Sequence, residues 1–262
     1  MKVSRLRRGG GVSAGVPGRG FTLVELLVVM AILGALVALA VPAMGRLGSA
    51  GSLNGAAAAI RGAFDQARTY AVANNTYTWV GIFEEDGAQE GRPSGKPGVG
   101  SLVICIVASR DGSPIYNKAQ AEAGAVQTLT SDRLVQVGKP QRLPNVHVAD
   151  LSGQAVGKRP AGMIQEQDRI GLATGAPLFS FRLPLLGGVY YDFGAGGGRG
   201  ANGIVQFNPQ GEAVSNFGTL SSPSANLEIA LQEARGTRPL GGPNAVAIDV
   251  SGCTGQTTIY RP

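Results

Sequence analysis

The sequence predicts an α+β protein in which one long N-terminal helix packs on a mainly antiparallel β-sheet domain. Three observations lead to this fold class. Residues 21–41 form a mainly apolar run, residues 53–71 repeat apolar side chains at helical spacing, and short apolar runs separated by Gly and Pro follow. We therefore expect four parts, which are a basic leader at 1–20, a transmembrane helix at 21–42, an amphipathic helix at 43–75, and a β-rich globular domain at 76–262.

The first 20 residues carry most of the positive charge of the chain. They contain no acid and five cations, Lys2, Arg5, Arg7, Arg8 and Arg19, which supply five of the six net charges. The remaining chain has 18 basic and 17 acidic side chains, a balance that gives no indication of nucleic-acid binding. Because cations beside a membrane helix stay in the cytoplasm, we expect the leader inside the cell and the domain after Pro42 in the periplasm.

The apolar run is long enough to cross a membrane and contains one charge. Its 21 residues would span about 31 Å as a helix. Glu25 lies near one end, where a carboxylate is tolerated in lipid only at a cost or with a partner. If the chain is cut after Gly20, the new amine of Phe21 is a cation close to Glu25. A Glu25 side chain that only reaches the headgroups is the alternative.

A resemblance to a known family lies at this junction. The stretch that carries it is Arg19-Gly20-Phe21-Thr22-Leu23-Val24-Glu25-Leu26. It resembles the processing site of type IV pilins and of the pseudopilins of type II secretion. The resemblance implies a pilin-like fold, cleavage after Gly20 by a prepilin peptidase, N-methylation of Phe21, and assembly guided by Glu25 through the Phe21 amine of a neighbouring subunit.

An ordinary secretory signal is a rival interpretation of the same residues. The leader cations would then be its basic region, and Ala38-Leu39-Ala40 its small-residue cleavage site. Glu25 would interrupt the apolar core of such a signal, which also runs too long before the cut. N-terminal sequencing separates the two, since the mature chain would begin at Phe21 or at Val41.

The transmembrane helix contains two weak points, Gly34 and Pro42. Glycine lowers helix stability by about 1 kcal/mol, and an internal proline removes a backbone hydrogen bond. In filaments of the resembling family the matching stretch loses helicity on packing, and the resemblance implies the same here.

The amphipathic helix and the strands are predicted from their patterns. The helix presents an apolar stripe, Leu53, Ala57, Ile60, Phe64, Ala67 and Ala71, and Asn74-Asn75 suits its end. The expected strands are 76–83, 101–109, 146–150, 179–183, 203–208, 212–215, 227–231, 245–250 and 257–260. Asn208, Pro209 and Gly211 suit a type I turn between two of them. The helix end, this hairpin and the last strand pair resemble the H-type minor pseudopilins and their pilus relatives.

The stretch between Arg110 and Arg169 gives a poor signal. A short helix near 118–124 is expected there, and the rest is rich in Gly, Pro and polar residues. We expect a poorly structured surface insertion around 110–170. No second hydrophobic core is expected elsewhere in the chain.

Catalytic, metal and cofactor sites are not predicted. The single histidine, His147, lies in a strand-like context without a nucleophile nearby. Four acids that could bind calcium lie close together, at Glu84, Glu85, Asp86 and Glu90. Because their spacing matches no calcium loop, we interpret them as a solvated acidic loop. Cys105 and Cys253 would meet an oxidising space, and the sequence leaves open two interpretations, a disulfide between them or a Cys105 that is simply a core residue.

The function expected from these features is structural. We expect a minor pseudopilin of a type II secretion system, with inner-membrane lipid, prepilin peptidase and other pilins as partners. A type IV pilus subunit for adhesion or DNA uptake, and a membrane-tethered periplasmic enzyme or binding protein, are the alternatives. Some pilus relatives bind DNA through a Gly-Arg-x-Arg turn, but the matching turn here is Gly255-Gln256-Thr257-Thr258, so no nucleic-acid partner is expected.

Overall fold

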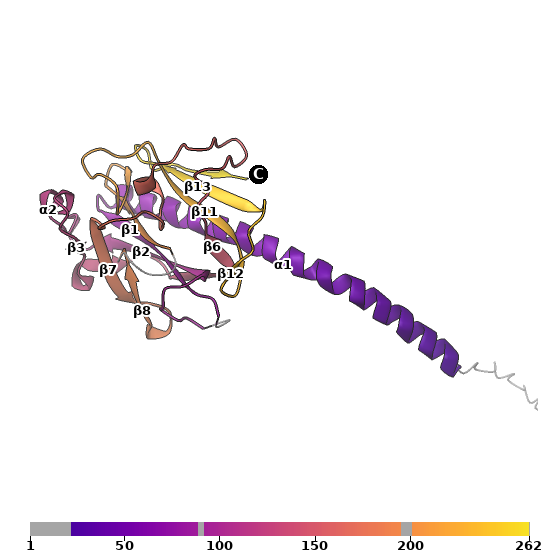
Figure 1. Cartoon of the computed structure of the whole chain (residues 1–262). Helices are drawn as coiled ribbons and strands as arrows, with labels where there is room; N and C mark the ends of the chain where they lie inside the picture. The colour runs from indigo at the N-terminus through magenta and orange to yellow at the C-terminus, as the bar shows by residue number, and fades with distance from the viewer. Residues whose placement is uncertain (1–21, 89–91, 195–200, 262) are drawn as a thin grey trace, which may run out of the picture. The chain divides into compact units, whose positions relative to one another are not determined.

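The structure is a computed structural model that describes residues 22–88, 92–194 and 201–261 (Figure 1). For residues 37–50 it describes the backbone only. The chain divides into two units, 1–45 and 46–262. The first unit contributes the beginning of helix α1, Leu23–Ala73, and the second contains all other elements.

Within the second unit, α1 is the centre of the main hydrophobic core. All six residues of the predicted stripe are buried, at 0–1% exposure, with Arg61 and Asp65 on the solvent side. The helix ends where the asparagine pair predicts. Asn75 adopts a left-handed conformation with φ 47°, and the N–H of Thr76 donates to the carbonyl of Ala71 at 3.0 Å. The stripe and the helix end are therefore confirmed.

A six-stranded antiparallel sheet covers one side of this helix. Its order is β10-β9-β1-β2-β4, and β5 also pairs with β2. The bounds are β1 Thr78–Asp86, β2 Gly100–Ser109, β4 Leu134–Gln136, β5 Gln141–Pro144, β9 Asn202–Phe207 and β10 Ala213–Ser215. The strands β1 and β2 are buried along almost their whole length, because elements pack on both faces of the sheet.

A second antiparallel sheet packs against the same helix. Its order is β12-β11-β13-β14, with β6 paired to β11. The bounds are β6 Val146–Val148, β11 Asn226–Arg235, β12 Arg238–Pro239, β13 Ala245–Ser251 and β14 Thr257–Tyr260. Ile60 and Phe64 of α1, Val80 of the first sheet and Ile229 and Ile248 of the second belong to one core cluster.

A second hydrophobic core lies on the outer face of the first sheet, contrary to the sequence-based expectation. It is covered by a small sheet of β3 Gln127–Thr128, β7 Phe179–Pro184 and β8 Tyr190–Phe193. Aromatic rings dominate it, and the rings of Phe181 and Phe193 have centroids 4.9 Å apart. Gly81 in β1 makes room for these rings, since a Cβ there would lie 2.6 Å from Phe193. The aromatic residues are scattered along the chain, so no local pattern revealed this core.

The stretch 110–169 also differs from the expected surface insertion. It contains the predicted short helix, α2 Lys118–Glu122, the strands β3 to β6, and 3₁₀ turns at Ser131–Arg133 and Glu166–Asp168. Leu129, Leu134, Val146 and Val148 are buried in the two main cores. The strand predicted at 146–150 is observed as β6, whereas β3, β4 and β5 have only two to four residues, too few to display an alternating pattern, so the sequence did not predict them.

The predicted hairpin forms between β9 and β10. The N–H of Gly211 donates to the carbonyl of Asn208 at 2.9 Å, as a type I turn requires. All nine predicted strands overlap observed ones. The remaining 3₁₀ turn, Leu186–Gly188, joins β7 to β8.

Both cysteines are free thiols. Cys105 is 1% exposed within the aromatic core, and burial raises the pKa of its thiol. Cys253 is exposed in the turn between β13 and β14. The disulfide left open by the sequence is not formed, and Cys105 is the core residue of the alternative interpretation.

Candidate functional site

The beginning of α1 is fixed by a side-chain cap. The hydroxyl of Thr22 accepts the backbone N–H of Glu25 at 3.2 Å, and the carbonyl of Thr22 accepts the N–H of Leu26 at 3.1 Å. A Thr cap with Glu three residues later is the sequence of a capping box. Glu25 therefore lies in the first helical turn, where the helix dipole favours a negative charge.

The helix surface that follows Glu25 is apolar on every side. Ten large apolar side chains are between 46% and 80% exposed, and they are Leu23, Val24, Leu26, Leu27, Val28, Val29, Met30, Ile32, Leu33 and Leu36. Residues 26–36 include no polar side chain that would mark a water-facing side. A helix that is apolar all round is stable only when another apolar phase or other helices surround it.

The described residues cover this segment only in part. Gly20 and Phe21, the predicted cleavage and methylation site, lie outside them. The backbone of α1 continues as helix through both Gly34 and Pro42. No helix in the described part of the chain is both long enough and apolar enough to cross a membrane.

Comparison with known protein families identifies this segment. Residues 18–41 match the model of the prokaryotic N-terminal methylation motif. The chain carries a prepilin-type methylation motif. The motif supports a subunit of the type IV pilin and pseudopilin class, processed by a prepilin peptidase and assembled with other pilins. The α+β fold is consistent with such a pilin-like subunit. No curated protein and no solved structure matched the chain.

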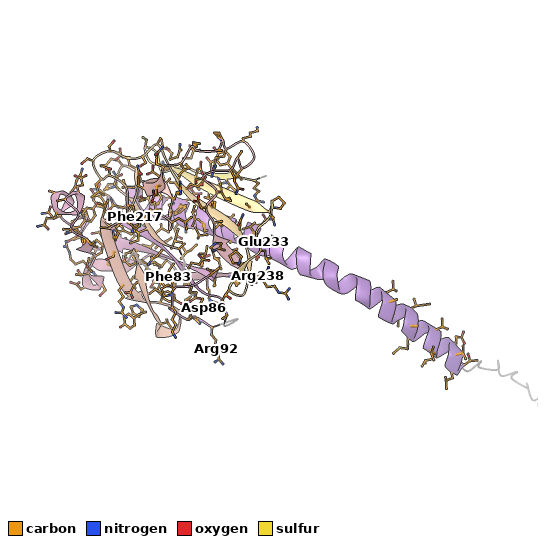
Figure 2. All side chains as sticks on the ribbon, in the orientation of Figure 1. Phe83, Asp86, Arg92, Phe217, Glu233 and Arg238 are labelled. Atoms are coloured by element: carbon orange, nitrogen blue, oxygen red, sulfur yellow. The ribbon has the colours of Figure 1, made fainter. Side chains whose placement is uncertain are left out.

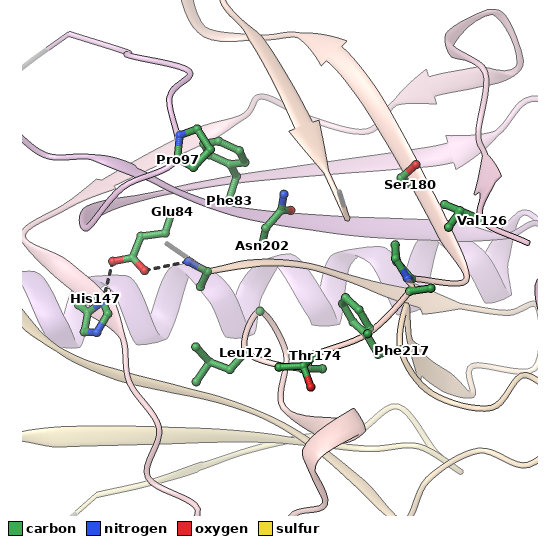
Figure 3. Close-up of a pocket in the computed structure, with 16 residues that line it drawn as sticks. Phe83, Glu84, Pro97, Val126, His147, Leu172, Thr174, Ser180, Asn202 and Phe217 are labelled. Carbon is green, nitrogen blue, oxygen red and sulfur yellow. Dashed lines mark hydrogen bonds and ion pairs between the residues drawn. The ribbon is translucent and has the colours of Figure 1, made fainter. Parts of the chain in front are cut away.

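A cavity in the globular domain is the second candidate site, far along the chain from the methylation motif (Figure 3). Its volume is about 910 Å³, and Phe83, Leu172 and Phe217 form much of its apolar wall. Glu84 and His147 lie at one end, with Nδ1 of His147 2.7 Å from the Glu84 carboxylate. Ser180, the serine that lines the cavity, lies at the other end from this pair in Figure 3.

The adjacent acids Glu84 and Glu85 have structural partners. Glu84 is 1% exposed and also accepts the backbone N–H groups of Gly100 and Ala201, both at 3.1 Å. Glu85 is fully buried and pairs with Arg142. Burial alone would raise the pKa of Glu85, but the hydrogen bonds from Arg142 and from the 94–95 backbone outweigh it and lower that pKa. Both acids are therefore buried and hydrogen-bonded at the end of β1. The interpretation of this stretch as a solvated acidic loop is wrong for these two residues.

A buried charge cluster lies on the outer face of the second sheet. Arg159 is 1% exposed and donates from Nη2 to Glu228 at 2.7 Å and to the carbonyl of Leu151 at 3.0 Å. Asp249 is paired in register with Glu228 and is 3% exposed. Neither carboxyl oxygen of Asp249 has a hydrogen-bond partner in the described residues. Burial, together with the charge of Glu228, raises the pKa of Asp249 to about 7.

Neither polar cluster has the features of a metal site. Within residues 22–88, 92–194 and 201–261, no three His, Cys, Asp or Glu side chains converge as metal ligands. Sequence reasoning considered His147 and the acids of the 84–90 loop but missed their separate partners. It missed Arg159 and Asp249 completely, because pairing across 69 residues leaves no local signal.

Proposed function

We propose that the chain is a minor pseudopilin of a type II secretion system. In this proposal residues 21–42 hold the processed subunit in the inner membrane until it enters a filament, with the domain in the periplasm. The observation that carries the proposal is the apolar helix surface of residues 23–36, which is exposed on all sides and lies within the methylation motif.

The exposed surface gives the driving force for assembly. Fully burying one large apolar side chain stabilises a structure by about 1.5–3 kcal/mol, so the ten side chains, which are 46–80% exposed, represent on the order of 10–20 kcal/mol. Lipid supplies this burial before assembly. In a filament the same residues of neighbouring subunits would replace lipid, so the transfer between the two states is nearly balanced and can be reversible.

The capped carboxylate supplies the direction of assembly. Within the described residues Glu25 has no ion-pair partner, and its side chain is exposed. Cleavage after Gly20 would leave the amine of Phe21 one residue before the Thr22 cap. We infer that Glu25 pairs with the Phe21 amine of a neighbouring subunit, because a carboxylate and an amine in an apolar surrounding attract strongly and fix the axial register.

The choice of a secretion pseudopilus over a pilus rests on the domain. Its helix end and its β9–β10 hairpin agree with the features that resemble the H-type minor pseudopilins. The third sheet and the second core add bulk to the outer face of the first sheet. A large domain suits a subunit used in few copies, which favours a minor role.

The test is to delete the gene in its own host and to measure secretion and pilus assembly separately. The proposal requires that secreted enzymes accumulate in the periplasm while surface pili remain. Mass spectrometry of the complemented strain should show a chain that begins with N-methylated Phe21. Loss of pili with normal secretion would instead favour the pilus subunit.

A binding function of the domain is the second candidate. The 910 Å³ cavity and its Glu84–His147 pair favour it. Native mass spectrometry of the purified chain checks it, since a ligand in this cavity would be retained and would be lost in a Leu172→Trp variant that fills the space.

A further inference from the structure

The strands of the second sheet run alongside α1. Their direction relative to the helix shows at which end of the domain α1 emerges. Gly255, before β14, lies against the side chain of Arg68. Arg261, after β14, donates to the side chain of Asn54 at 2.6 Å. The strand β14 therefore runs toward the N-terminal side of α1. Because β11 and β14 are both antiparallel to β13, β11 runs the same way.

The hairpin of β11 and β12 projects furthest in that direction. Tyr260 pairs with Ala247, which pairs with Ala230 of β11. Arg235 lies five residues further along β11, so the hairpin extends about 16 Å past the end of β14 at the usual rise per residue. The backbone of Gly236 in its turn packs against Gly100 and Gly87, so the end of the β1–β2 hairpin lies at the same place.

Arginines gather at this end of the domain, here called the exit face. It carries the exposed residues Arg92, Lys96, Arg235 and Arg238 near its tip, and Arg261 about 16 Å behind them at the end of β14. Figure 2 shows Arg92 and Arg238 there, with the acids Asp86 and Glu233 beside them. Asp86 accepts a hydrogen bond from the backbone N–H of Ala88, and Glu233 accepts one from Asn244. Neither acid is paired with these cations.

Two of the arginines face each other directly. Arg235 and Arg238 are cross-strand partners in the register of β11 and β12. Like charges in that position repel each other. Neither guanidinium makes an ion pair or a side-chain hydrogen bond within the described residues. An anion bound between the two guanidinium groups would attract both of them and offset their mutual repulsion.

The positive charge of the exit face is not cancelled by the rest of the surface. Five acids of the domain are buried, namely Glu84, Glu85, Asp168, Glu228 and Asp249, whereas Arg159 is the buried cation among the described residues. Among the described residues, burial thus removes five acids but one cation from the accessible surface, although Glu85 and Glu228 still offset the charges of Arg142 and Arg159. The field at the exit face can act on a charged surface within about 10 Å at an ionic strength of about 0.1 M.

We propose that the exit face binds the anionic headgroups of the membrane in which the subunit waits before assembly. The proposal rests on the proposed function, in which the membrane segment ends near Val41. From Val41 to Asn54 is 13 residues, a helical reach of at most about 20 Å. These 13 residues tether the domain to the membrane segment, so the headgroups stay within reach of the exit face. Docking would hold the domain on the membrane until the subunit is extracted.

The test uses the full chain with a single probe on the exit face. A Cys253→Ser, Thr237→Cys chain is labelled at position 237 with an environment-sensitive dye; the other thiol, Cys105, is buried and stays unlabelled. The chain is reconstituted in vesicles of phosphatidylcholine alone or with phosphatidylglycerol. A headgroup-linked quencher should quench the dye strongly only in the anionic vesicles, and 1 M NaCl should remove the difference.

Variants test whether the exit face itself, and not the overall charge of the domain, binds the headgroups. Arg235→Gln with Arg238→Gln should lower the docked-to-undocked ratio about 25-fold, since each cation near an anionic surface contributes about fivefold. Lys118→Gln, on α2 at the other end of the domain, is the control and should have no effect. Equal quenching in both vesicle types, or no change in the double variant, overturns the proposal.

Two further readouts keep the outcomes distinct. Flotation with neutral vesicles in 1 M NaCl reports the helix anchor of the proposed function and does not depend on the exit face. If the chain fails to float there but binds anionic vesicles through the two arginines, the anchor fails and the exit face stands. If duplex DNA binds the labelled chain more tightly than anionic vesicles do at equal salt, the exit face is a nucleic-acid surface and the lipid proposal is overturned.

Discussion

The Arg159–Glu228–Asp249 cluster predicts that the domain loses stability as the pH rises through neutrality. In the folded chain the pKa of Asp249 is about 7, whereas its ordinary value is 3.8. The folded state therefore holds a proton on Asp249 that the unfolded state releases. Its stabilising effect is fully present below pH 3.8 and is lost as the pH rises to about 7.

The size of the effect follows from the shift. One pKa unit corresponds to about 1.4 kcal/mol, and the proton is half lost at pH 7, so the free energy of unfolding should fall by about 2 kcal/mol between pH 5 and pH 7. Asp249→Asn keeps the shape of the protonated acid and cannot ionise. The variant should remove this decline and be more stable than the parent chain at pH 8.

The assay is urea unfolding of the full chain in neutral detergent, at pH values from 5 to 8. The single tryptophan, Trp79, is buried in the aromatic core and reports unfolding by its fluorescence. Asp65→Asn, on the exposed side of α1, is the matched control and should follow the parent profile. If parent and Asp249→Asn chains show parallel pH profiles, Asp249 is ionised in the fold and the reasoning is refuted.

Four further predictions concern the N-terminal segment and DNA. Replacing Gly20 with leucine should leave a precursor about 20 residues longer than the mature chain on immunoblots, and a normal mature band would contradict the cleavage site. Glu25→Leu should insert at least as well in the membrane but fail to enter filaments, as scored by cross-linking; normal incorporation would show that its charge only reaches the headgroups. Pro42→Ala should stiffen the helix and alter filament geometry in electron micrographs, and unchanged geometry would make the weak segment incidental. The chain should bind duplex DNA weakly in gel shifts and release it by physiological salt, whereas sub-micromolar binding at that salt would favour a DNA-uptake pilus.

Local patterns predicted most of the fold. The stripe from Leu53 to Ala71 and the short apolar runs of β1, β9 and β13 depend on neighbours within a few residues, so the sequence alone displays them. The hairpin at Asn208–Gly211 was predictable for the same reason. The short strands and the aromatic core were not, because they depend on pairing between distant segments such as Trp79 with Gln206, whose side chains are 3.0 Å apart.

The candidate sites were likewise predictable only where they depend on residues close together in the sequence. The methylation motif is a contiguous sequence, and the family comparison found it where the residues predict. The Glu84–His147 pair joins residues 63 positions apart, and the exit face joins a hairpin turn to the last residues of the chain. The near-neutral count of charged residues also gave an incomplete picture of the surface, because the count does not show that five of the acids are buried.

The position of α1 between two sheets has a mechanical consequence for a protein that is pulled from its N-terminal end. A load on the helix enters the middle of the core, between Val80 of one sheet and Ile248 of the other. Because β14 lies along the helix from Arg68 to Asn54, such a load slides the helix parallel to the strand and strains many contacts at once. Contacts loaded together in shear resist far more force than contacts peeled one after another, so the domain should travel with its helix as one body.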